Sequence, residues 1–139
     1  MVKKNGSMKL IISIMIMTLC STRIAADGFI PESFSPPTLI SADEFVLEPL
    51  GPRLVEIDYI AYMSSIEHLQ RTFSRGGSWP NDSITREDAM IDMQTEQARF
   101  EARESFAYAV LDLDREVELG CVYVYPSKKR GFDAMVRLW

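Results

Sequence analysis

The sequence predicts a single α/β (α+β) domain in which a strand and two helices precede a three-strand antiparallel meander. Over about 54–73 and 85–103, apolar side chains recur every three or four positions, as on one face of a helix. After Ser105 they alternate with a period of two, which is the spacing of a strand. The chain has 139 residues, of which 47% are hydrophobic and 25% charged, so it is long enough for one domain with a buried core.

The first 26 residues have the layout of a secretory signal peptide. A basic start is followed by an apolar run from Leu10 to Cys20 and by small or polar residues up to Ala26. Because a membrane-spanning helix takes about 20 residues, we expect cleavage after Ala26, no stable membrane span afterwards, and a secreted or periplasmic domain. An uncleaved anchor or a cytoplasmic chain with a later start remains an alternative.

The charge excludes one class of partner. Of the 15 Lys and Arg residues, four lie in 1–26, which contains no acid, so 27–139 carries 11 bases against 20 acids and a net charge of −9. Nucleic-acid binding needs clustered positive charge. We therefore expect no nucleic-acid partner.

The predicted elements follow in order from these spacings. Residues 27–43, rich in proline and small polar side chains, predict a linker or extended arm, and 44–50 predict a short strand that Pro49 places at a sheet edge. Helices are predicted over about 54–73 and 85–103, the second beginning at a capping box of Thr85 and Asp88. Strands are expected over 106–111, 117–125 and 131–139.

Few residues are candidates for chemistry. One His and two Cys have no metal-ligand spacing, so we expect no zinc site, and Cys121 is interpreted as a small buried strand residue. Glu67 and His68 either line a pocket for a polar substrate, with one of them as a general base, or belong to a solvated helix face. Trp79 is either a ligand platform or a plug over the sheet edge.

Several stretches resemble the N-terminal half of the GNAT superfamily of N-acetyltransferases, and in particular a bacterial subgroup. They are LEPLGP (47–52), AYMSSIEHLQRT (61–72), WP (79–80), FAYAVLDLD (106–114), ELGCVYVYPS (118–127) and DAMVRLW (133–139). The resemblance covers about 44–139 and implies acetyl transfer from acetyl-CoA to the amine of a small molecule or peptide. It makes DAMVRLW the fourth strand, with Val136, Arg137 and Leu138 facing the pantetheine arm of acetyl-CoA.

The same resemblance implies that the loop around Trp79 walls the acceptor pocket, near Glu67 and His68. The family's pyrophosphate-binding loop would come directly after the fourth strand, and the sequence ends at Trp139 before it. We therefore expect a C-terminally truncated GNAT-like domain over 44–139, with no catalytic residue assigned. A secreted binding module without catalysis and a fragment of a split gene are the alternatives. An exposed last strand would favour homodimer formation.

Overall fold

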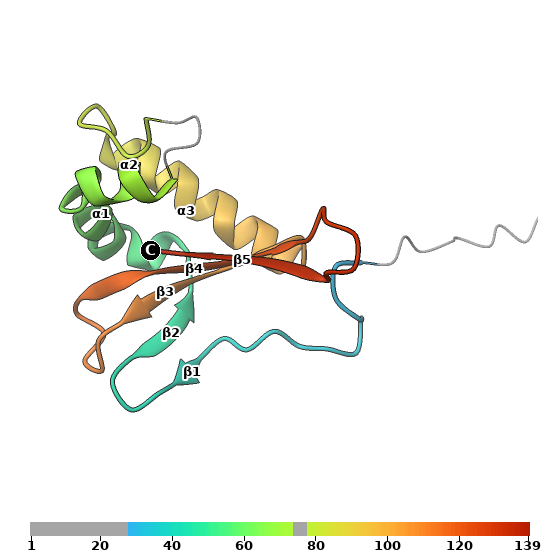
Figure 1. Ribbon diagram of the computed structural model, residues 1–139. Helices are drawn as coiled ribbons and strands as arrows, with labels where there is room; N and C mark the ends of the chain where they lie inside the picture. Colours follow the sequence, from blue (N-terminus) through green and yellow to red (C-terminus); the bar gives the residue numbers. More distant parts are fainter. Residues whose placement is uncertain (1–27, 74–77) are drawn as a thin grey trace, which may run out of the picture.

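A computed structural model describes residues 28–73 and 78–139 as a five-stranded antiparallel sheet with three helices on one side (Figure 1). The predicted α/β class, and a partial GNAT-like order of elements, are confirmed. The predicted signal peptide, 1–26, lies outside the described residues. The strands are β1 (Ile40–Ser41), β2 (Val46–Pro49), β3 (Phe106–Leu111), β4 (Glu118–Pro126) and β5 (Ala134–Leu138). The helices are α1 (Val55–Met63), α2 (Ile66–Phe73) and α3 (Arg86–Glu101), with a single 3-10 turn, Pro52–Leu54, before α1.

The strands lie in the sheet in their order along the chain, β1 to β5. β1 pairs only with Val46 and Leu47 of β2, so the outer side of β2 has no strand partner where Pro49 stands. This position suits a residue that has no N–H to donate. β4 is the longest strand and connects the two halves of the meander, with Ala109 opposite Cys121 on one side and Val136 opposite Val124 on the other.

The helical region differs from the prediction at one point, because the helix predicted over 54–73 is broken at Ser64 and Ser65. The Ser64 hydroxyl donates a hydrogen bond to the Ala61 carbonyl oxygen over 2.8 Å. Serine side chains that bond to nearby backbone in this way compete with the helical pattern. The second predicted helix is present as α3, and its capping box is present as well. The Asp88 N–H donates to the Thr85 hydroxyl oxygen, and the Thr85 N–H donates to the Asp88 carboxylate.

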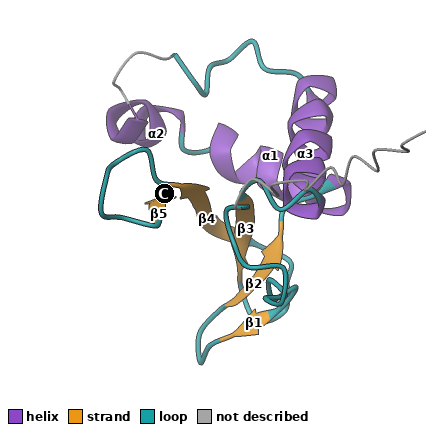
Figure 2. Ribbon diagram, turned by 90° about the vertical axis from the view of Figure 1, so that its right-hand side faces the viewer, coloured by secondary structure: helices purple, strands orange, loops and turns teal. Residues whose placement is uncertain are grey.

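The core lies between the helices and the sheet, two layers that Figure 2 shows from another side. Small residues on β3 allow α1 and α3 to approach the sheet closely, and large apolar residues of the helices fill the space above them. The buried cluster is Val46, Leu50, Leu54, Val55, Tyr62, Leu69, Ala89, Met93, Ala107, Ala109, Leu111 and Cys121. Among the described residues, no helix combines the length and the apolar character needed to cross a membrane.

The arm before β1 packs against the sheet. Phe29 stacks on Phe106 with ring centroids 5.7 Å apart. The Arg103 guanidinium donates hydrogen bonds to the carbonyl oxygens of Pro31 and Phe34, over 2.7 and 2.8 Å. Tyr108 on β3 also donates a hydrogen bond to the Pro37 carbonyl oxygen. The arm is thus held at several points by β3 and by Arg103, which lies between α3 and β3.

Candidate functional site

A cavity of about 190 Å³ opens between α1, α3 and β4, on the helix-covered side of the sheet. It has an acidic part and an apolar part. Its lining residues are Leu50, Asp58, Tyr62, Trp79, Asp92, Met93, Glu96 and Tyr123. Pockets with a few polar groups in an apolar wall are the usual form of small-molecule sites, which makes this cavity the candidate site.

The spacing of residues along the two helices explains why these side chains meet. Asp58 and Tyr62 are four residues apart on α1, and Asp92 and Glu96 are four residues apart on α3, so each pair lies on one helix face. Tyr123 lies two residues after Cys121 on β4 and therefore on the same, helix-facing side of the strand. Tertiary packing of α1 on α3 brings the two acidic faces together.

Asp58 is the most deeply placed acid of the cavity wall, with only 6% of its surface exposed. Burial raises the pKa of its carboxyl to about 6, although hydrogen bonding with Glu118 and Cys121 partly opposes this. A carboxylate whose pKa lies near neutrality can accept a proton and release it again at physiological pH. Asp58 therefore has the protonation behaviour of a general base.

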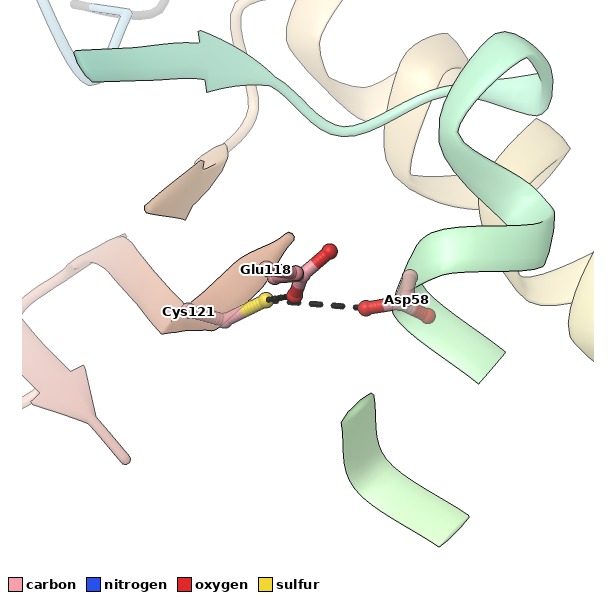
Figure 3. Close-up of side chains that lie close together, drawn as sticks. All are labelled: Asp58, Glu118 and Cys121. Atoms are coloured by element: carbon pink, nitrogen blue, oxygen red, sulfur yellow. Dashed lines mark hydrogen bonds between the residues drawn. The ribbon is translucent and has the colours of Figure 1, made fainter. Parts of the chain in front are cut away.

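A second buried acid, Glu118, lies behind Asp58 together with Cys121 (Figure 3). The Cys121 thiol donates to Glu118 Oε1 over 3.0 Å and contacts Asp58 Oδ1 at 3.7 Å. Burial, followed by the charge of Asp58, raises the pKa of Glu118 to about 9. Burial and the two carboxylates also raise the pKa of the Cys121 thiol. At neutral pH the cluster therefore holds a proton on Glu118 and another on Cys121.

These three groups are also the described residues best placed to hold a metal ion, since one ligand atom from each lies within 4.8 Å of the others. Metal binding requires a thiolate and an ionised carboxylate. Because burial holds protons on both Cys121 and Glu118, an ion would have to displace them. The spacing of the single His and the two Cys gives no signal for this grouping, because two of its three members are carboxyl groups that the fold brings to Cys121.

A contrasting buried acid, Glu48, has a different environment. It forms ion pairs with Arg53 and, over 3.0 Å, with Arg115. Buried carboxylates of proteins are normally paired in this way. No ion pair involves Asp58 or Glu118 among the described residues. Unlike Glu48, these two buried acids therefore have no cationic partner in the described part of the chain.

The acids on α3 complete the polar part of the cavity. Glu96 pairs with Arg99 through Oε1 over 2.8 Å, whereas its Oε2 is buried and has no hydrogen-bond partner in the described part of the chain. Burial, followed by the charge of Asp88, raises the pKa of Asp92. The exposed Asp92 and the half-buried Glu96 thus add two carboxyl groups to the cavity wall, and Arg99 pairs with one oxygen of Glu96.

The aromatic wall consists of Tyr62, Trp79 and Tyr123. The rings of Tyr62 and Trp79 are tilted by 43° with centroids 5.5 Å apart, and Tyr59 packs edge-on against Tyr62. Tyr59 itself is held by a hydrogen bond from its hydroxyl to the Ile84 carbonyl oxygen, over 3.0 Å. These contacts fix the apolar side of the cavity.

The residues singled out by sequence lie in three different places. Trp79 lines the cavity. Glu67, with 88% of its side chain exposed, pairs with Arg71 over 3.5 Å on α2, and His68 is exposed on the same helix. Neither of these two is among the residues that line the cavity.

The predicted cofactor-contacting residues Val136, Arg137 and Leu138 lie on β5, the last strand of the described sheet, and all three are exposed. They are not part of the cavity wall. Sequence reasoning missed four acids, namely Asp58, Asp92, Glu96 and Glu118. The signals available for them were the position of Asp58 between apolar residues of a helix and the four-residue spacing of Asp92 and Glu96.

Comparison with known proteins gives a fold and no closer relationship. No family model matches the sequence, and no curated protein matches it. A solved structure with a similar fold is a Bordetella pertussis protein provisionally assigned to the GnaT family of acetyltransferases. The TM-score is 0.50 at 16% sequence identity, over 74% of this chain and 57% of that one. The chain thus has a partial GNAT-like fold and matches little more than half the length of this neighbour.

Proposed function

We propose that this chain is a GNAT-like N-acetyltransferase domain that transfers an acetyl group from acetyl-CoA to an amine, and that it belongs to a bacterial subgroup of that superfamily. The observation that carries the proposal is the cavity beside Asp58, which joins an acid of suitable pKa to an apolar wall. The GNAT-like fold supports the choice of reaction.

Asp58 would act on the acceptor. An alkyl ammonium must lose a proton before its nitrogen can attack a carbonyl carbon, and ionised Asp58 in the cavity wall can take that proton. Acetyl-CoA supplies the acetyl group, whose C–S bond breaks as the C–N bond forms, while the second nitrogen proton goes to sulfur. Glu118 and Cys121 would hold Asp58 in place from behind, which makes them positioning residues.

The free edge of β5 fits the pantetheine arm of acetyl-CoA. In the described sheet β5 pairs with β4 on one side only, so alternate backbone N–H and C=O groups around Val136, Arg137 and Leu138 are open to a ligand's amides. We propose that these residues hold the arm through their backbone. The pyrophosphate needs a further anion site of the kind formed at a helix N-terminus.

Calorimetry of residues 27–139 with acetyl-CoA, followed by an acetylation assay on an amine library, tests the proposal. We expect binding and acetylation, with acetylation reduced by Asp58→Asn at unchanged acetyl-CoA affinity. Asp114→Asn, the same change in the exposed turn between β3 and β4, is the matched control. Absence of heat at millimolar acetyl-CoA would overturn the assignment.

A finer proposal concerns export. We propose that the chain is exported through the leader 1–26. Mass spectrometry of the mature N-terminus tests this: a first residue of Asp27 supports export, and an intact Met1 or Met8 on cytosolic protein contradicts it.

A second candidate function, a secreted interaction module, is favoured by the exposure of β5. Every residue of this strand is exposed, with Leu138 at 64%, and unpaired strand edges pair readily with other strands. We propose that two copies join through β5. Sedimentation measurements should give a dimer that Val136→Lys converts to a monomer, whereas a monomeric wild-type protein would contradict this proposal.

A further inference from the structure

The cavity beside Asp58 carries excess negative charge from two helices. Its wall contains Asp58 from α1 and Asp92 and Glu96 from α3, and no Lys, Arg or His lines it among the residues that the structure describes. Arg99 compensates Glu96. Asp58 and Asp92 form no ion pair within the described ranges 28–73 and 78–139. Behind Asp58, burial and the Asp58 charge raise the pKa of Glu118 to about 9, which favours its neutral form. Two carboxylates that face one small cavity therefore lack a cationic partner.

The rest of the wall suits a hydrocarbon body with positive ends. Tyr62, Trp79 and Tyr123 present aromatic surface, and Leu50 and Met93 close the space between them. Aromatic faces attract alkyl ammonium groups in addition to covering apolar surface. The described part of the wall offers three carboxylates and no cationic group, which disfavours a carboxylate or phosphate ligand.

The volume limits the size of the ligand. At 190 Å³ the cavity has the space of about six water molecules at roughly 30 Å³ each. A chain of a few carbon atoms with an amine at each end fits this space, whereas a folded peptide terminus or an amino sugar with several rings does not.

One buried atom also lacks a donor. Glu96 Oε2 is shielded from solvent and has no hydrogen-bond partner among the described residues, although burying such an atom without a donor is costly. An ammonium group has three N–H donors. Placed beside the α3 acids, it could compensate Asp92, and a turn of the Glu96 side chain would bring the shielded Oε2 to the same ammonium group.

We propose, on the basis of the proposed acetyl transfer, that the acceptor is a short alkyl diamine bound as a dication, with one end between Asp92 and Glu96 and the other at Asp58. The end at Asp58 is the one that loses its proton and reacts. The end at α3 stays protonated and fixes the length of chain that can reach Asp58.

Calorimetric titration of residues 27–139 with three probes of similar length tests the inference: 1,4-diaminobutane, n-butylamine and 1,4-butanediol. Each is measured with and without saturating CoA, so that a required binding order is not mistaken for absence of binding. The diamine should bind at least tenfold more tightly than the monoamine, since each well-placed charged hydrogen bond contributes that much. The diol should show no binding. Equal affinities for diamine and monoamine would overturn the proposal.

Variants locate the binding site. Asp92→Asn should weaken diamine binding by about tenfold or more and leave butylamine binding unchanged, whereas Asp114→Asn should alter neither. Asp92 is exposed on α3, and thermal unfolding of each variant verifies that it is folded. A diamine affinity that Asp92→Asn leaves unchanged would place the ligand elsewhere and contradict the inference.

The outcome is separable from that of the proposed function. Diamine binding without acetylation in the presence of acetyl-CoA would support the diamine as ligand and contradict the proposed acetyl transfer. Acetylation of butylamine at the same rate as the diamine would support acetyl transfer and contradict the diamine as the specific acceptor.

Discussion

Replacing Glu118 with glutamine should change how the free energy of unfolding depends on pH. It should leave the free energy of unfolding in mild acid nearly unchanged. Glu118 is 7% exposed, and its pKa is raised from 4.5 to about 9, chiefly by burial. Between these two values the folded chain holds a proton that the unfolded chain releases. The contribution of Glu118 to the free energy of unfolding is therefore fully present below pH 4.5 and is lost as the pH rises towards 9.

The magnitude follows from the pKa difference. One pH unit corresponds to about 1.4 kcal/mol for one proton, so the wild-type protein should lose at most about 4 kcal/mol between pH 5 and pH 8 through Glu118. Asp58, raised from 3.8 to about 6, adds a smaller loss of the same sign that ends near pH 6. In Glu118→Gln the larger of these losses is absent, because the side chain is neutral at every pH.

Urea unfolding at pH 5, 6, 7 and 8 measures this difference. We expect the free energy of unfolding of Glu118→Gln to be close to that of the wild type at pH 5 and higher at pH 8. Glu116→Gln, an exposed change in the turn just before β4, should follow the wild type throughout. Parallel curves for the wild type and Glu118→Gln would refute the reasoning, because they would mean that Glu118 is ionised in the folded protein.

Three further predictions concern other parts of the fold. Gly120→Ala should lower the free energy of unfolding by about 2 kcal/mol or more in urea denaturation, because Gly120 has φ +152° and a Cβ there would overlap the carbonyl oxygen of Trp139; an unchanged midpoint would contradict this packing. In a Cys20→Ser chain, Cys121 should react with a thiol reagent only after unfolding, since it is fully buried; rapid labelling of the native protein would show that the cluster opens. Arg103→Ala should increase proteolytic cleavage within the arm, residues 28–39, without changing the core, because it removes two hydrogen bonds to arm carbonyls; cleavage at the wild-type rate would mean that the arm is held by its other contacts.

Local patterns in the sequence were sufficient for the elements. The spacing of apolar residues predicts both helical regions and the three strands of the meander, and Thr85 with Asp88 predicts the start of α3. These features depend on neighbours within a few residues, through backbone hydrogen bonds and side-chain direction. The two-residue strand β1 was missed because it depends on pairing with Val46 and Leu47. The break at Ser64 was missed although its hydrogen bond to Ala61 is local, because the apolar spacing of 54–73 continues across it.

The candidate site was also only partly predictable from the sequence. Trp79 stood out in the sequence as a large ring in a loop, and it does line the cavity. Glu67 and His68 stood out as well, but nothing in their spacing indicates which side of α2 faces solvent.

The spacing of residues was enough to assign helix, strand and arm to their segments. Which acids become buried and acquire raised pKa values depends on how those segments pack. Asp58 and Glu118 are 60 residues apart, and each belongs to a segment that looks ordinary by itself. Packing of α1 on β4 removes both from water beside Cys121. Their altered pKa values follow from that burial, which is a property of the assembled layers and of no single segment.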